Sequence, residues 1–178
     1  ELYRFLESDV LSFYLSHQYP LDKGGAEGGG CFLGGTEVLM ANGQTKKIED
    51  VKVGDFIKTK ISPNSTKLIS TKVLNKFVHK VDGYILLNNQ LRVTTEHNLY
   101  INGRWITAGE IRLGDSFLGI DGEYHKVVNI QVHTGINTVY NLETENQHTY
   151  FADGYYVHND KGGSLFKDTA FFGTLTTN

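Results

Sequence analysis

The chain has 178 residues, of which 39% are hydrophobic and 21% charged, a composition typical of a folded domain with a hydrophobic core. Its formal net charge of −3 gives no electrostatic reason to expect nucleic acid as a partner, and no apolar run is long enough to span a membrane. The single cysteine, Cys31, excludes an internal disulfide and a multi-cysteine zinc site. Because the chain begins at Glu1 and its one methionine is Met40, we expect either a processed chain or a piece cut from a longer protein, and the localisation stays open.

The first 30 residues predict a short helix followed by a linker. Apolar residues recur at helical spacing from Leu2 to Tyr14, and Pro20 ends the pattern. Residues 22–30, DKGGAEGGG, contain five glycines and are typical of a flexible linker. We therefore expect residues 1–30 to be an upstream flank of the folded domain.

Residues 31–159 predict an all-β domain. Short runs rich in Val, Ile, Thr, Tyr and Phe alternate with Asn-Gly, Asp-Gly and Gly-Asp turn signals, and little of this stretch has a sustained helical period. The sequence DKGG of residues 22–25 then recurs at 160–163. We expect residues 160–178 to form a downstream flank.

An internal repeat lies within the predicted β domain. Residues 37–57 align without gaps on residues 97–117, and each copy contains an Asn-Gly pair and, near its end, a Gly-Asp pair. Each copy predicts two strands joined by a hairpin turn and followed by a tight turn. The two copies indicate two similar β lobes related by a pseudo-two-fold axis.

The two boundaries of the β domain carry residues that could cut the chain. Cys31 follows three glycines, so its thiol can reach the carbonyl of Gly30 and exchange the amide for a thioester. At the other boundary the side-chain amide of Asn159 can attack its own backbone carbonyl and release the chain from Asp160 onward. Each residue also has an ordinary explanation, since a lone cysteine is commonly a small buried side chain.

Three stretches together carry a resemblance to a known family. CFLGGTEVLMANGQTKKIEDVKVGD (31–55), LRVTTEHNLY (91–100) and HTYFADGYYVHN (148–159) resemble the Hint superfamily of self-processing domains, which includes inteins, bacterial intein-like domains and the autoprocessing part of Hedgehog proteins. The resemblance covers residues 31–159 and implies a horseshoe-like, all-β Hint fold with pseudo-two-fold symmetry. It implies autocatalytic, single-turnover rearrangement of peptide bonds without a cofactor or a metal.

The same resemblance implies a role for each motif residue. In the Thr-x-x-His motif, His97 acts on the nitrogen of the scissile bond after Gly30, and Thr94 orients that bond. At the downstream boundary, His148 helps to deprotonate the side chain of Asn159, and His158 donates a proton to the departing amide nitrogen. The other histidines, His17, His79, His125 and His133, are expected to be structural or exposed.

Two positions depart from the usual intein pattern. Asp160 stands where efficiently splicing inteins have Ser, Thr or Cys, so the thioester lacks its usual acceptor. We expect water or an external thiol to attack it, as in A-type bacterial intein-like domains, with Ser164 or the freed Asp160 amine as less usual acceptors. Asn141 stands where many inteins carry an aspartate, which predicts loose coupling between the two cleavages.

Three other functions stay open at this stage. A Hedgehog-type domain passes its thioester to a sterol but has no use for His158, Asn159 and a downstream segment. A cysteine hydrolase would process added peptide in trans, and a binding or structural β module would leave Cys31 inert. If the chain processes itself, its partners are its own flanks and an external thiol or water. We expect such a chain to be a monomer.

Overall fold

The structure is a computed structural model that describes residues 30–159. The helix and the linkers predicted within residues 1–29 and 160–178 lie outside the described residues. Within 30–159 no helix is long and apolar enough to cross a membrane.

The described residues form strands joined by turns, with two short 3₁₀ helices. The elements in chain order are β1 Phe32–Leu33, β2 Glu37–Leu39, β3 Thr45–Lys47, η1 Ile48–Asp50, β4 Phe56–Lys60, β5 Leu68–Leu87, β6 Leu91–Val93, β7 Asn98–Ile101, β8 Arg104–Thr107, η2 Ala108–Glu110, β9 Ser116–Leu118, β10 Tyr124–Lys126, β11 Ile130–Thr144, β12 Thr149–Ala152 and β13 Tyr155–His158. The predicted all-β fold is confirmed.

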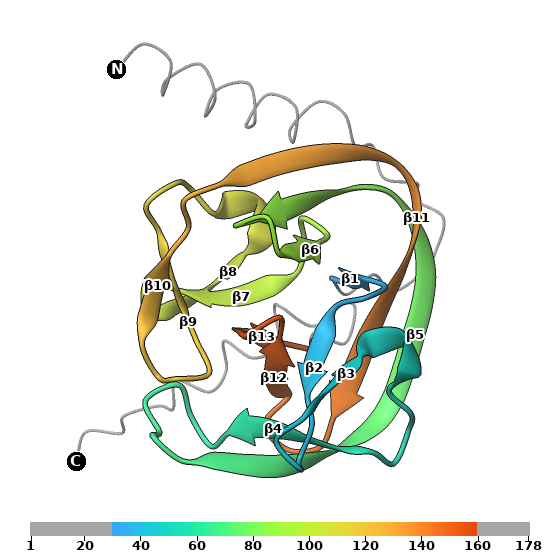
Figure 1. Cartoon of the computed structure of the whole chain (residues 1–178), viewed down its shortest axis with the longest axis vertical. Coiled ribbons are helices and arrows are strands. Elements are labelled where there is room, and N and C mark those ends of the chain that lie inside the picture. Colours follow the sequence, from blue (N-terminus) through green and yellow to red (C-terminus); the bar gives the residue numbers. More distant parts are fainter. Residues whose placement is uncertain (1–29, 160–178) are drawn as a thin grey trace, which may run out of the picture.

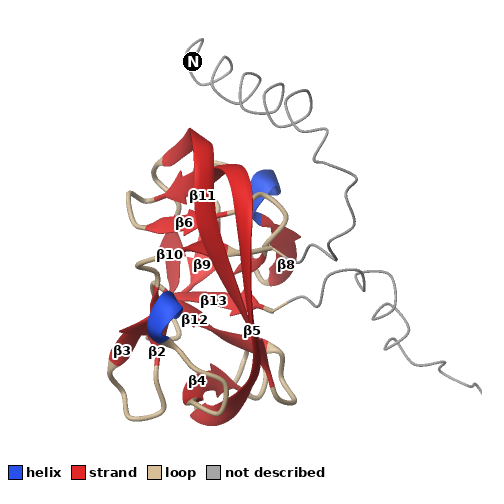
Figure 2. Ribbon diagram, turned by 90° about the vertical axis from the view of Figure 1, so that its right-hand side faces the viewer, coloured by secondary structure: helices blue, strands red, loops and turns tan. Residues whose placement is uncertain are grey.

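Two sheets share the strands. One has the order β11-β1-β6-β5-β4, and the other follows β10-β9-β7-β13-β12-β2-β3 with β8 paired to β7. The long strands β5 and β11 pair antiparallel from Leu87↔Ile130 to Val73↔Thr144 and curve around one side of the molecule (Figure 1). Figure 2 shows this ribbon running along the molecule with one 3₁₀ helix in each half. The curved ribbon gives the molecule the horseshoe-like outline that the sequence predicts.

The repeated sequence forms two similar lobes. The elements β2, β3, η1 and β4 of the first copy correspond to β7, β8, η2 and β9 of the second. Gly54 donates its N–H to the Val73 carbonyl at 2.8 Å, and Gly114 donates to the Val127 carbonyl at the same distance. Both glycines have a left-handed φ, 93° and 89°, which glycine adopts without strain. The predicted pseudo-two-fold relation is confirmed.

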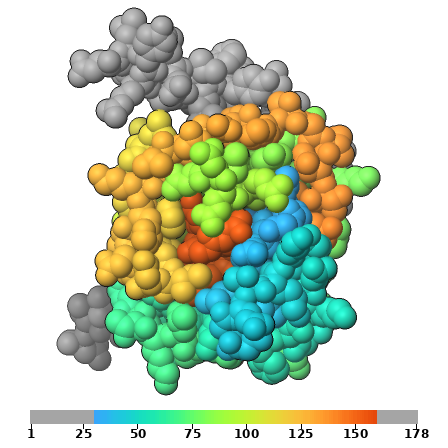
Figure 3. Space-filling view, in the orientation of Figure 1, coloured from blue at the N-terminus to red at the C-terminus, as the bar shows by residue number. Residues whose placement is uncertain are grey.

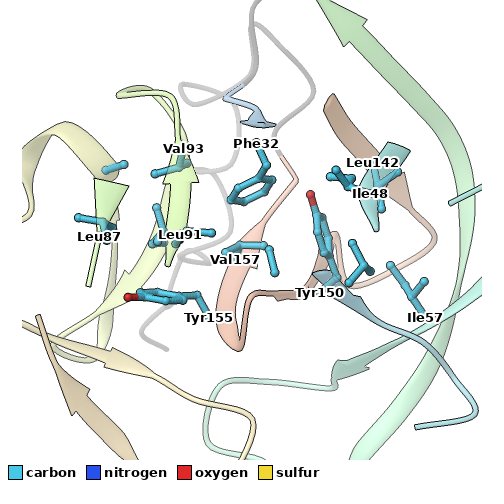
Figure 4. Packing of buried hydrophobic residues seen from close by; sticks show 14 of the residues in the cluster. Phe32, Ile48, Ile57, Leu87, Leu91, Val93, Leu142, Tyr150, Tyr155 and Val157 are labelled. Carbon is cyan, nitrogen blue, oxygen red and sulfur yellow. The ribbon is translucent and has the colours of Figure 1, made fainter. Parts of the chain in front are cut away.

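The hydrophobic core lies between the lobes and is centred on β1, β12 and β13. Figure 4 shows Phe32 close to Tyr150 and Val157 in this core, and the rings of Phe32 and Tyr150 have centroids 6.2 Å apart. All four residues of β12 and the first three of β13 are buried, because alternate side chains of these strands pack into two hydrophobic clusters on opposite faces of the sheet. In Figure 3 the last strands of the domain lie at the centre of the face, enclosed by earlier segments of the chain. The end of the domain is therefore held inside it.

Candidate active site

The upstream boundary is fixed by hydrogen bonds between Cys31 and Thr94. The Cys31 N–H donates to Thr94 Oγ1 at 2.9 Å, and the Thr94 N–H donates to the Cys31 carbonyl at 2.9 Å. These bonds extend the pairing of β1 with β6, in which Phe32 faces Val93. The threonine hydroxyl is thus bound to the nitrogen of the Gly30–Cys31 peptide bond.

His97 packs directly against the same peptide bond. A Cβ atom added to Gly30 would lie 2.1 Å from the His97 Cα and 2.3 Å from its Cβ, so any residue except glycine forces the backbone to move. The ring of His97 packs on the ring of Phe32 with centroids 4.2 Å apart. Only 1% of His97 is exposed, so its imidazole is shielded from water.

The thiol of Cys31 is buried and protonated. Burial raises the pKa of Cys31 to about 12, and the negative charge of Glu96 acts in the same direction. Glu96 is exposed and accepts a hydrogen bond from its neighbour Thr95. Because the thiolate is the nucleophilic form, the thiol must lose its proton as it attacks.

The downstream boundary residue, Asn159, comes directly after the last residue of β13. Asn159 donates its N–H to the His148 carbonyl at 2.8 Å, which extends the pairing of β12 with β13 by one residue. Its side chain is buried, and neither Nδ2 nor Oδ1 has a hydrogen-bond partner within residues 30–159. The ring of His158 lies edge-on to Trp105, with centroids 5.3 Å apart. His148 has a left-handed φ of 53°, which marks a sharp turn of the backbone before β12.

The sheet brings the two boundaries to the same place. β13 pairs with β7 at Val157↔Leu99, so Asn159, two residues after Val157, and His97, two residues before Leu99, lie toward the same end of this antiparallel strand pair. Gly30 packs on that same His97. The two ends of the domain therefore come to the same end of the β7–β13 strand pair.

Asn141 lies on β11, the strand that pairs with β1 directly after Cys31. β1 pairs with β11 at Phe32↔Tyr140, so the next pair along the two strands is Cys31 with Asn141. The Oδ1 atom of Asn141 accepts hydrogen bonds from the Leu142 N–H at 2.9 Å and the Tyr150 hydroxyl at 3.1 Å. The sequence analysis names Asn141 but misses Tyr150. The only sequence feature that could have identified Tyr150 is its position two residues after His148 in the stretch HTYFADGYYVHN.

Several histidines lie away from this site. His125 forms an exposed pair with Asp121 at 2.9 Å, and the ring of His133 stacks on Tyr84 with centroids 5.0 Å apart. Among the residues that the structure describes, no cluster of three or more His, Cys, Asp or Glu could hold a metal ion.

The fold and its two-ended site define a self-processing domain of the Hint superfamily. The profile of the Pretoxin HINT domain family matches residues 37–163, and the chain belongs to this family. No curated protein sequence matches it.

Solved structures of inteins have the same fold. The bacterial intein-like domain from Clostridium thermocellum is 25% identical with a TM-score of 0.65, and the match covers 72% of this chain and 98% of that one. A DnaB intein from Synechocystis is 24% identical with a TM-score of 0.63, over 74% of this chain and 99% of that one. The gp41-1 intein is 22% identical with a TM-score of 0.61, over 74% and 100%.

Proposed function

We propose that this chain cuts itself at both boundaries, after Gly30 and after Asn159. In the first step the Cys31 sulfur bonds to the Gly30 carbonyl carbon, the bond from that carbon to the Cys31 nitrogen breaks, and the thiol proton ends on that nitrogen. The product is a thioester, which water or an external thiol cleaves to release residues 1–30. The observation that carries the proposal is the packing of Gly30 on His97 while Thr94 binds the Cys31 nitrogen.

The side chains around this bond fit the proton movements of the step. His97 is buried and lies against Gly30, the residue before the nitrogen that must gain a proton, so we assign it the role of general acid. The high pKa of Cys31 keeps the resting thiol neutral, so little thiolate is present before the attack. The thiol must therefore give up its proton during the step, within a site shielded from water.

At the downstream boundary, Asn159 Nδ2 attacks the Asn159 carbonyl carbon and forms a succinimide. The bond to the Asp160 nitrogen breaks, a proton leaves Nδ2 with help from His148, and His158 gives a proton to the departing amine. Two observations support this step. The Asn159 side chain is buried with no competing hydrogen bond within residues 30–159, and its N–H is held by the His148 carbonyl.

The position after Asn159 favours cutting over joining. Asp160 has no hydroxyl or thiol to take the acyl group from the thioester, so each boundary is cleaved separately. The substrate is the chain's own flanks, and each molecule reacts once as a monomer. The family description names a pretoxin, and release of the segment from Asp160 onward fits that description.

The test is mass analysis of the full chain with both flanks. We expect separate fragments 1–30, 31–159 and 160–178, with thiol adding to the first. Cys31→Ala should abolish cleavage after Gly30 but leave the downstream cut, and Asn159→Ala should do the reverse. Asn64→Ala, an exposed asparagine outside the site, is the control and should react like the parent.

The other outcomes separate the alternative functions. A peptide joining residues 1–30 to 160–178 as the main product would contradict cleavage and indicate splicing. Turnover of excess added peptide would indicate a hydrolase acting in trans. An intact mass that never changes with added thiol would indicate an inert β module.

A further inference from the structure

The side chains of Cys31 and Asn141 face the same side of the sheet. Cys31 packs with Leu33 and Val139, and the register Phe32↔Tyr140 of β1 and β11, continued by one residue past the start of β1, sets Cys31 beside Asn141. Directly opposed side chains in such a pair have Cβ atoms about 4.5–5.5 Å apart. The Asn141 amide is therefore a neighbour of the thiol that our proposed function makes the nucleophile.

Two hydrogen bonds determine which way the amide of Asn141 is turned. The Leu142 N–H can only donate, so the side-chain atom 2.9 Å from it must be the oxygen Oδ1. The Tyr150 hydroxyl donates to the same oxygen at 3.1 Å. These two donors use both lone pairs of Oδ1, so the hydrogen-bonding capacity left on Asn141 consists of its two N–H bonds.

The Tyr150 hydroxyl can always donate a hydrogen bond, because the residue is fully buried in the core and stays protonated. Burial raises the pKa of Tyr150 well above its ordinary value, and the nearby Cys31 raises it further. The phenol therefore keeps its proton. Its ring is packed near Phe32, the residue after the nucleophile, which limits its movement.

We propose that Tyr150 is a positioning residue that holds Asn141 with its N–H bonds available to the thioester step. Asn141 then donates a hydrogen bond to the oxygen that becomes negative when the Cys31 sulfur attacks the Gly30 carbonyl. It neither takes nor gives a proton, so the thiol proton moves by the route already described. This inference rests on the proposed thioester formation at Cys31.

The first test compares two buried tyrosines in the full chain carrying Asn159→Ala, which isolates the upstream step. The readout is the first-order rate of thiol-induced cleavage at saturating thiol. We expect Tyr150→Phe to be about tenfold slower, since a hydrogen bond that orients the amide is lost. Tyr156→Phe is the matched control, because its buried hydroxyl donates to Thr149 Oγ1 at the same 3.1 Å. It should stay within about twofold of the parent.

The second test separates a donor from a structural role. Ionised Asn141→Asp keeps oxygens that accept from Leu142 and Tyr150 but has no hydrogen to donate, so at a pH above its carboxyl pKa we expect it to be as slow as Asn141→Ala. Adding Tyr150→Phe to Asn141→Ala should slow the reaction no further, because Tyr150 acts through Asn141. Thermal melts confirm that each variant is folded.

Distinct results would overturn the inference and the proposed function. A parent that forms no thiol-cleavable bond would remove the proposed function. Normal parent cleavage with Tyr150→Phe equal to Tyr156→Phe, or with Asn141→Asp as fast as the parent, would remove only the role of Tyr150 and Asn141. Further slowing of Asn141→Ala by Tyr150→Phe would show that Tyr150 acts by itself.

Discussion

Gly30 is a residue whose identity is dictated by a neighbour far along the chain. The sequence shows three glycines before Cys31, which is typical of a linker. The structure shows that the last of them packs against the backbone and side chain of His97, where a Cβ atom has no space. This glycine lets the chain just before Cys31 approach His97 closely.

Gly30→Ala should therefore slow the upstream cleavage. The new methyl group pushes the peptide bond away from His97, and misplacing a reacting bond by about 1 Å costs on the order of a hundredfold in rate. The measurement is thiol-induced release of residues 1–30, followed by mass spectrometry. Gly34→Ala is the control, because its Cβ would lie 3.5 Å from Tyr140, an ordinary contact. Equal rates for the two variants would contradict the requirement for glycine at position 30.

At the scale of elements, the two lobes repeat one turn with different charges. Asp55 Oδ2 accepts the Lys52 N–H at 3.0 Å, and Asp115 Oδ2 accepts the Arg112 N–H at 2.8 Å. Asp55 also pairs with Lys46 at 2.9 Å, and this hydrogen bond, followed by the Lys52 N–H, lowers its pKa. Asp115 instead accepts a neutral hydrogen bond from an amide N–H of Asn102. The same backbone turn is therefore charge-paired in one lobe only.

We expect Asp55→Asn to lower the melting temperature more than Asp115→Asn. Both variants keep an oxygen for the turn, but only the first loses an ion pair, worth about 0.2–1 kcal/mol when exposed. The difference should shrink in 1 M salt and vanish at acid pH. A carboxyl group whose pKa is lowered by folding stabilises the fold at pH values above its unfolded-state pKa. This stabilisation is lost as the pH falls through the folded-state pKa. Equal, salt-independent shifts would contradict this.

At the scale of the whole molecule, the last strand of the domain is among its most enclosed elements. β13 lies between β12 and β7, whereas β3 and β10 are edge strands with exposed or half-buried side chains. This central position holds Asn159 against the sheet, so the downstream boundary is ordered by the fold.

Hydrogen exchange should show this difference. Amides of β13, such as that of Val157, should exchange at least about a hundredfold more slowly than those of β10, because opening them requires disruption of the core. The measurement is residue-resolved exchange followed by NMR on the full chain carrying Cys31→Ala and Asn159→Ala, which stays intact. Similar rates in β13 and β10 would mean that the end of the domain opens independently of the core.

The sequence predicts much of this protein because its signals are local. Short β-rich runs, the turn pairs of the repeat and the ordered motifs predict the all-β Hint fold, and the structure and comparisons confirm it. The same motifs identify His97 and Asn159 as candidates, and the chemical roles of these residues stay predictions. The ends of the chain, residues 1–29 and 160–178, also keep only their sequence-based predictions.

The sequence alone thus determined the fold class, the duplication and the residue types at the two boundaries. Only the tertiary structure decided that Gly30 packs on His97, that β13 pairs with β7 just before Asn159, and that the Tyr150 hydroxyl donates to Asn141. These contacts depend on the register between strands far apart in sequence. Register is set by burial of whole strand faces, which no short motif encodes.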